Sequence, residues 1–183
     1  MNELSLYILD LTQNSISAGA TRIELSIVID EENDKIIIVL KDDGCGMDEE
    51  FLARVVSPFT TTRTTRKVGL GIPMIKEQCE SCDGEFSIES EVGVGTTLNM
   101  SFRKSHIDLP PMGDLADTMV TLVNGAPDKP DFVLTYRNGG EEFVFDTAQI
   151  RQILDGVPLN TPDVLMWINQ FVTEGIEEAG KLP

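Results

Sequence analysis

Two polar side chains near the start of the chain could do chemistry together. Asp10 and Asn14 are four residues apart in a segment, 9–21, that reads as the end of an amphipathic helix. At that spacing a carboxylate and a carboxamide lie on one face of the helix. Such a pair can hold a magnesium ion and accept a proton from an attacking water or hydroxyl. The alternative is a solvated aspartate and a surface asparagine.

A second candidate carboxylate ends an apolar, β-branched segment at 35–40. Asp42 opens the motif D-D-G-C-G-M at 42–47, in which Gly44 and Gly46 allow the backbone to turn sharply and approach a ligand closely. A carboxylate at the end of a buried strand is well placed to accept a hydrogen bond from an exocyclic amine, such as that of adenine. An ordinary Asp-Gly loop is the alternative.

The next two segments could bind phosphate. The stretch S-P-F-T-T-T-R-T-T-R-K at 57–67 is the only locally basic, hydroxyl-rich part of an acidic chain, and this composition is typical of a mobile cover over a triphosphate or of a solvated linker. It leads into V-G-L-G-I-P at 68–73. Gly69 and Gly71 precede a helical pattern and would expose backbone N–H groups to an anion. A glycine pair alone is weak evidence for such a site.

The cysteines indicate no disulfide framework. There are three of them, at positions 45, 79 and 82, and an odd number fits a reducing compartment. The C-E-S-C motif at 79–82 could suggest redox or metal chemistry. One further cysteine and a single histidine, His106, supply few ligands, so structural thiols are the better interpretation.

The pattern of helices and strands expected to position these residues predicts an α+β fold. The strands should form two hairpins of one mixed sheet, and the helices should cover one face in a two-layer sandwich. We expect helices at 3–17, 48–56 and 72–82 and strands at 22–29, 35–40, 85–89 and 96–102.

The composition of the chain changes at a double proline, Pro110-Pro111. This change predicts that the chain has three parts. These are a domain at 1–105, a linker at 106–113 and a smaller α+β C-terminal domain at 114–183. The last part shows a hairpin around R-N-G-G at 137–140, a segment at 115–123 that could be helix or strand, and helices at 147–154 and after Thr161. An apolar stripe at 164–176 could be core or a dimer seam, so the oligomeric state stays open.

Charge and hydropathy exclude several classes of partner. The 183 residues include 31 acidic and 14 basic side chains, for a net charge of -17, which argues against nucleic acid as a partner. No run of eighteen apolar residues predicts a membrane span, and the N-terminus lacks the pattern of a secretory signal. We therefore expect a cytoplasmic protein.

Taken together and in this order, the motifs resemble the nucleotide site of the GHKL superfamily. That superfamily comprises gyrase-type topoisomerases, the large heat-shock chaperones, histidine kinases and MutL-type mismatch-repair ATPases. The stretch D-L-T-Q-N-S-I-S-A-G-A-T-R-I-E-L and the motif D-D-G-C-G-M are similar to the MutL boxes. The stretches P-F-T-T-T-R, K-V-G-L-G-I and S-E-V-G-V-G-T-T-L are closer to the catalytic domain of histidine kinases, and together the motifs cover the first domain.

The resemblance implies ATP and Mg²⁺ as ligands and gives each residue a role. Asn14 would coordinate magnesium, Asp42 would bind the adenine amine, and Asp10 falls where MutL-type ATPases and anti-sigma serine kinases carry a glutamate base. Phosphates would lie on the glycines of the third motif, under a lid from Thr60 to Val68. The other implied nucleotide contacts are Gly44, Gly46, Met47, Phe59, Thr60, Thr61, Thr62, Arg63, Lys67, Val68, Gly69, Leu70, Gly71, and Thr96 or Thr97 near the base.

Three departures from the family pattern bear on function. Asp10 is one methylene shorter than glutamate, which limits its reach, and Ser17 replaces an acid usual in MutL-like sequences. No helical hairpin with a phosphoacceptor histidine precedes the domain, so we expect no histidine kinase complete in one chain unless His106 is the acceptor.

We therefore expect an Mg-ATP-binding protein that transfers the γ-phosphate to an unidentified protein partner. The regulator would be histidine-kinase-like or anti-sigma serine-kinase-like, with Asp10 as base and Arg63, Arg66 or Lys67 closing over the phosphates. The alternatives are a nucleotide-sensing interaction module, in which ATP orders the lid and a partner binds, and a slow ATPase switch.

Overall fold

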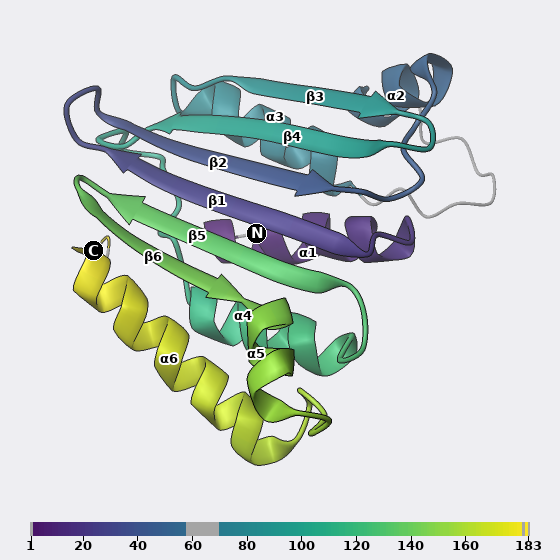
Figure 1. The fold of residues 1–183 in the computed structure, drawn as a ribbon. Helices are drawn as coiled ribbons and strands as arrows, with labels where there is room; N and C mark the ends of the chain where they lie inside the picture. The colour runs from purple at the N-terminus through teal and green to yellow at the C-terminus, as the bar shows by residue number, and fades with distance from the viewer. Residues whose placement is uncertain (1, 58–69, 181, 183) are drawn as a thin grey trace.

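The fold is a single mixed sheet with helices packed on one face, as seen in a computed structural model that describes residues 2–57, 70–180 and 182 (Figure 1). The six strands lie in the order β3-β4-β2-β1-β5-β6. The elements are α1 (Leu4–Ser17), β1 (Arg22–Asp30), β2 (Lys35–Asp42), α2 (Glu49–Val56), α3 (Gly71–Ser81), β3 (Phe86–Glu91), β4 (Gly95–Arg103), α4 (Leu115–Gly125), β5 (Asp131–Asn138), β6 (Glu141–Asp146), α5 (Thr147–Leu154) and α6 (Pro162–Gly180).

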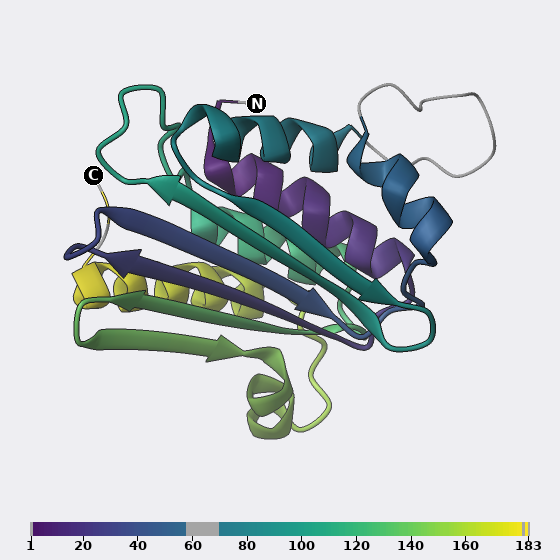
Figure 2. The same cartoon turned by 90° about the horizontal axis from the view of Figure 1, so that it is seen from above.

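Alternation along the strands produces the two layers. In β1 and β2 every second side chain is buried, and the antiparallel register sets Leu25 opposite Leu40 and Ile27 opposite Ile38. These side chains meet the helical layer of α1, α3, α4 and α6, which lie on one side of the sheet when the molecule is seen from above, whereas α5 lies apart from them below β6 (Figure 2). The predicted α+β architecture with a mixed sheet is confirmed.

Helix α1 lies at the centre of the helical layer, between α3 and α4. It buries Leu4, Ile8 and Leu11 almost completely. Its first turn is capped by the segment expected as a linker, because the N–H groups of Leu4 and Ser5 donate to the carbonyls of Pro111 and Met112 at 2.9 and 2.8 Å. Residues 111–112 therefore fix the start of the helix that carries Asp10 and Asn14.

The tail continues the same sheet. β5 pairs in parallel with β1, so that Leu134 stands opposite Leu25, and β6 pairs antiparallel with β5 as the predicted hairpin. The segment at 115–123, which could have been helix or strand, is helix α4, and it packs between α1 and α6. The division into domains at 1–105 and 114–183 stays a prediction, whereas the strands of both parts share one sheet.

The apolar stripe of α6 is mostly core of this chain. Val164, Ile168, Val172 and Ile176 are at most 9% exposed, and they follow one another at helical spacing along the face turned toward the sheet. Within the described ranges 2–57, 70–180 and 182, none of the helices combines the length and the apolar character needed to cross a membrane.

Candidate functional site

The carboxylate of Asp42, at the end of β2, is held from two sides. Ser15 of α1 donates a hydrogen bond from Oγ to Asp42 Oδ2 over 2.6 Å, and the Gly44 N–H donates to Oδ1 over 2.9 Å. The Ser15 side of this contact is shielded from water, since Ser15 is 4% exposed. A carboxylate with two such bonds keeps free lone pairs, so Asp42 can still accept a hydrogen bond from a ligand amine.

The pair in the first helix, Asp10 and Asn14, is half-buried. Oδ2 of Asp10 is buried and has no hydrogen-bond partner among the described residues. It lies against the first residue of α3, because a Cβ built on Gly71 would come within 2.0 Å of it. A buried polar atom without a partner is costly, so the position suits a ligand that supplies a proton donor or a cation. The oxygen donors of this pair are also of the type that Mg²⁺ prefers, and the residues fit that ion.

Helix α3 begins beside this carboxylate at Gly71. Its N-cap residue, Leu70, makes no side-chain capping bond and is 58% exposed. The first-turn N–H groups of an α-helix carry partial positive charge. The structure thus brings the base candidate Asp10 next to Gly71, at the end of α3 that was predicted as a phosphate seat.

The glycine loop at 44–47 is fixed between α1 and the β3–β4 turn. The Cys45 N–H donates to the Ala18 carbonyl at 2.9 Å, the Cys45 carbonyl accepts from the Gly93 N–H at 2.8 Å, and the Met47 N–H donates to Ser90 Oγ at 2.8 Å. Gly46 has φ +68° and packs so closely that an added Cβ would lie 2.0 Å from the Glu91 carbonyl oxygen. A side chain would therefore break this loop.

The two threonine candidates lie on opposite faces of the sheet. Thr96 stands opposite Asp42 in the β2–β4 ladder, so both belong to the helix-covered face, and its hydroxyl lies 2.8 Å from Ser90 Oγ. Thr97 stands opposite Lys41 on the open face. The register thus separates Thr96, near Asp42, from Thr97.

Three residues near Asp42 escaped the sequence reasoning. Ser15 and Ser90 lie within stretches that resemble the family motifs, but the resemblance gave neither of them a role. Gly95 does carry a signal, since it is the second glycine of the turn V-G-V-G: a Cβ there would lie 2.0 Å from the Asp42 carbonyl oxygen. Because Gly95 has no side chain, β4 can approach the end of β2 closely.

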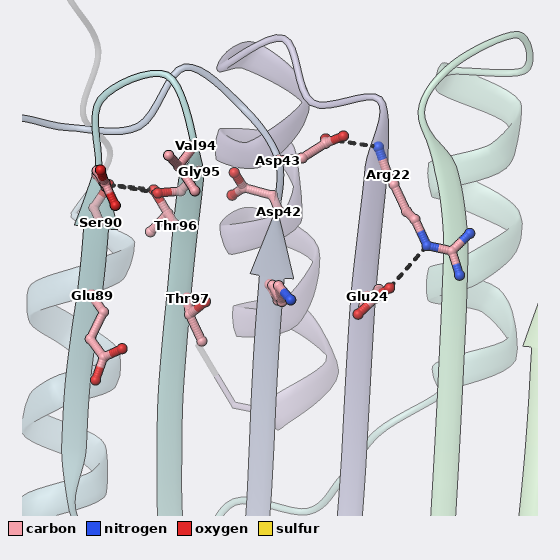
Figure 3. A pocket seen from close by; sticks show the side chains of 12 residues that line it. Arg22, Glu24, Asp42, Asp43, Glu89, Ser90, Val94, Gly95, Thr96 and Thr97 are labelled. Atoms are coloured by element: carbon pink, nitrogen blue, oxygen red, sulfur yellow. Dashed lines mark hydrogen bonds and ion pairs between the residues drawn. The ribbon is translucent and has the colours of Figure 1, made fainter.

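A hollow of about 450 Å³ lies at this end of the sheet (Figure 3). It shares Asp42, Ser90, Gly95 and Thr96 with the site, and open-face residues such as Lys41 and Glu89 line it elsewhere. Asp10 and Asn14 do not line it. The hollow therefore reaches Asp42 from the open face of the sheet. Asp10, Asn14 and the start of α3 lie on the helix-covered face.

The neighbouring Asp43 has a structural role. Its carboxylate accepts hydrogen bonds from the Thr21 hydroxyl and from the N–H groups of Thr21 and Arg22, at 2.7 and 2.9 Å for the latter two. The Thr21 hydroxyl is the main reason that the pKa of Asp43 lies below its usual range, and the backbone N–H groups act in the same direction. Asp43 thereby ties the start of β1 to the end of β2.

The lid candidates cannot be placed in the site. The residues Phe59, Thr60, Thr61, Thr62, Arg63, Arg66, Lys67, Val68 and Gly69 lie outside the described residues.

The cysteine motif at 79–82 is packed into the core. Cys79 and Cys82 are both fully buried free thiols, and burial raises the pKa of Cys79 to about 12. No cluster of metal-ligating side chains occurs in the part of the chain that the structure describes. These findings agree with structural thiols.

His106 is remote from the site. It follows β4 at the end of the sheet where β2 begins, and its Nε2 lies 3.8 Å from Asp83, just beyond the end of α3. Asp42 closes the other end of β2, an eight-residue strand that spans about 25 Å. Within one chain, His106 therefore stands at the opposite end of the sheet from Asp10 and Asp42.

The fold and the site now define the class of protein. Residues 2–106 match the profile of the histidine kinase-, DNA gyrase B-, and HSP90-like ATPase family. The match covers more than half of the chain, and the chain belongs to this family. It contains an ATPase domain of the histidine-kinase type, which is consistent with ATP binding.

Several kinases and sensor proteins are similar to the same part of the chain. A putative sensor protein of Shewanella frigidimarina is 35% identical over 109 residues, which are 58% of this chain and 16% of that protein. Sporulation kinase E and sporulation kinase C of Bacillus subtilis are 34% and 30% identical over 55% and 54% of this chain. The chain spans 14% and 23% of those two proteins, less than a quarter of either.

Solved structures give weaker similarities. The MutL ATPase domain of Aquifex aeolicus complexed with ADP has a TM-score of 0.49 and 17% identity, over 85% of this chain and 70% of that chain. The catalytic domain of histidine kinase ThkA has a TM-score of 0.41 and 22% identity, over 54% and 64% of the two chains.

Proposed function

We propose that this protein binds Mg-ATP between α1, the end of β2 and the start of α3, and transfers the γ-phosphate to a partner protein. The observation that carries the proposal is the buried, unpartnered Oδ2 of Asp10 against Gly71. A carboxylate kept without a partner beside the positive end of a helix is suited to accept a proton from a group attacking a phosphate bound there.

Asp42 would recognise the adenine. Its carboxylate is fixed by Ser15 and Gly44 but retains acceptor capacity for the exocyclic amine. Thr96, on the same face in the next strand, adds a hydroxyl beside it. Gly44 and Gly46 keep the loop backbone free of side chains where the base would enter.

Asn14 would hold the magnesium ion through its carboxamide oxygen, which leaves the carboxylate of Asp10 for the role of base. When bound, Mg²⁺ neutralises the charge on the phosphates. The protein's own contribution is to position these groups. Helix α1 presents Asp10 and Asn14 to the start of α3, and its two ends are fixed by Pro111 and Met112 on one side and by Cys45 on the other.

In the transfer step, the acceptor oxygen bonds to the γ-phosphorus while the bond between that phosphorus and the β–γ bridging oxygen breaks. ADP leaves, and the acceptor's proton passes to Asp10. Because His106 lies at the far end of the sheet, the proposal places the acceptor on a partner protein. A hydroxyl acceptor fits best, since a hydroxyl has a proton for Asp10 to take. The proposal also places the protein in the cytoplasm, where ATP is available.

The test follows the γ-phosphate. The purified protein is incubated with Mg-ATP labelled on the γ-phosphate, alone and with a cell extract, beside Asp10→Asn, Asp42→Asn and the control Gln13→Ala, an exposed position of α1. We expect label on a protein with wild type and Gln13→Ala, none with Asp10→Asn although it still binds nucleotide, and weaker nucleotide binding by Asp42→Asn.

Other outcomes contradict parts of the proposal. Label released as free phosphate would make the protein an ATPase. Label that stays on ATP while nucleotide still binds would favour the nucleotide-sensing module. Full transfer by Asp10→Asn would remove Asp10 from the role of base.

A further inference from the structure

An exposed aromatic surface lies at the outer edge of the sheet, far from the nucleotide site. Phe171 of α6 contacts Phe143 of β6 edge to face at 5.3 Å, and Trp167 stacks on Phe171 at 4.8 Å. Trp167 is 46% exposed and Phe171 37% exposed. We call Phe143, Trp167 and Phe171 the aromatic ledge. It runs along the junction of α6 and β6, the two elements at the lower edge of Figure 1.

The ledge is fixed by packing. Gly175, in the middle of α6, lies against the Phe143 ring, and a Cβ built there would be 2.1 Å from two ring carbons. Glycine inside a helix is less favourable than alanine. Here it lets the ring lie directly on the helix, one turn beyond Phe171, so the three rings have defined positions.

The ledge lies on the outer side of the core. Phe143 packs against the core cluster and Phe171 lies 6.5 Å from the buried ring of Phe145, whereas Trp167 stacks on the outer side of Phe171. The core face of α6 is supplied by its separate stripe of aliphatic side chains, which is already buried against the sheet. Stacked aromatic rings left partly in water beside such a complete core are typical of a protein-binding surface.

The two elements that carry the ledge have acidic side chains and no basic ones. Neither β6 nor α6 contains a lysine or arginine within its bounds. Their acidic side chains are Glu141, Glu142, Asp146, Asp163, Glu174, Glu177 and Glu178. Of these, Glu142 is paired with Arg137 of β5, and Asp146 lies 3.9 Å from Arg22. A second copy docked symmetrically here would bring acid against acid, and anionic lipid or nucleic acid would be repelled as well.

We propose that the aromatic ledge binds a segment of a partner protein in which apolar side chains are flanked by lysine or arginine. The rings would bury the apolar side chains, and the acids of β6 and α6 would pair with the basic ones. The inference goes beyond the proposed function, because the ledge shares no residue with the nucleotide site and requires no nucleotide.

Trp167 makes the proposal directly measurable, since it is the only tryptophan in the chain. The probe is a tryptophan-free amphipathic peptide of leucine and lysine, titrated into the full chain while Trp167 fluorescence is recorded. We expect a saturable shift of the emission to shorter wavelength, and weaker binding as salt is added. A matched peptide of leucine and glutamate should leave the emission unchanged.

Charge reversal locates the binding surface. The double variant Glu141→Lys, Glu174→Lys should bind the leucine-lysine peptide about tenfold more weakly. The control Glu32→Lys, Glu85→Lys has the same net charge but alters exposed acids away from the ledge. Glu32 lies in the turn between the middle strands β1 and β2, and Glu85 precedes β3 at the opposite sheet edge, so this variant should bind like wild type. Asp42→Asn should also bind the peptide normally, which keeps this test separate from that of the proposed function.

Three results would overturn the proposal. The first is absence of any Trp167 response to the leucine-lysine peptide by the folded protein. The second is equal binding of the leucine-glutamate peptide or an equal loss in the control variant. The third is self-association with Trp167 shielded in the protein alone, measured by sedimentation, which would make a second copy the occupant.

Discussion

Ser15 Oγ donates a 2.6 Å hydrogen bond to Asp42 Oδ2 and so joins helix α1 to the end of strand β2. The contact links the helix that carries Asp10 and Asn14 to the carboxylate expected to read the base. We expect Ser15→Ala to lower the free energy of unfolding by about 1–2 kcal/mol, because a hydrogen bond to a carboxylate is lost on a shielded side. Nucleotide affinity should fall as well. Urea unfolding and nucleotide titration check both effects, and Ser17→Ala, exposed on the same helix, should change neither.

Gly71 is expected to be essential for phosphoryl chemistry. In Gly71→Ala the new methyl group would meet Asp10 Oδ2, since the ideal Cβ position lies 2.0 Å from that oxygen. Displacing a reacting group by about 1 Å can cost about a hundredfold in rate. We therefore expect the rate of phosphate transfer to fall by that order. Gly125→Ala is the matched control, because no atom lies within 4 Å of a Cβ at that position; a similar loss there would rule out the Asp10 contact as the cause.

Cys79 should be unreactive in the native protein. Burial raises its pKa to about 12 from an ordinary value of 9.0, so the thiolate that reacts with a disulfide reagent is scarce at neutral pH. At pH 8 we expect the exposed Cys45 to react fast and the buried Cys79 and Cys82 only on unfolding. Rapid native-state modification of Cys79, read by peptide mapping, would contradict this.

The same shift predicts a dependence of stability on alkaline pH. Because the pKa of Cys79 is higher in the folded than in the unfolded protein, the neutral thiol contributes to the free energy of unfolding. This contribution is complete below pH 9 and is lost as the pH rises toward 12. Tyr7 and Tyr136 also have raised pKa values, because both are buried. The difference in unfolding free energy between wild type and Cys79→Ala isolates the cysteine, and it should shrink only above pH 9.

Gly175→Ala should disrupt the aromatic ledge. The added methyl group would overlap the Phe143 ring, and overpacking of this kind typically costs about 1–3 kcal/mol. We expect lower stability in urea and a changed emission of Trp167, which stacks on the neighbouring Phe171. An unchanged spectrum and a stability gain, as helix propensity alone predicts, would show that the ring does not depend on this glycine.

The sequence predicts the secondary structure well, because its periodicity is strong and its turns are marked. The alternation in 22–29 and 35–40 and the turn R-N-G-G at 137–140 gave hairpins that the structure confirms. The parallel pairing of β5 with β1 could not be read, since no local pattern encodes which edge a distant hairpin joins. Residues 106–113 read as a linker because of their prolines, whereas the role of Pro111 and Met112 as a cap for α1 depends on a tertiary contact.

The candidate site, like the fold, could be predicted from the sequence only in part. Helical spacing placed Asp10 and Asn14 on one helix, and the motif at 42–47 indicated Asp42. The contact of Asp10 with Gly71 and the difference between Thr96 and Thr97 required the packing of α3 and the strand register. Ser15 could not be selected, because a small serine on the apolar face of a helix is usually ordinary core, and its partner Asp42 is set by tertiary packing.

The pairing of β1 with β5 also decides when the site can form during synthesis. Arg22 stands opposite Asp131 in this ladder, so the strand that follows α1 acquires its second neighbour only after more than a hundred further residues have left the ribosome. Until then, one edge of β1 lacks its final hydrogen-bond partners, whereas the first turn of α1 waits only for Pro111 and Met112. A nascent chain stalled before residue 131 should therefore leave this edge open to chaperones or to other chains, and the nucleotide-binding half should complete its fold late in translation.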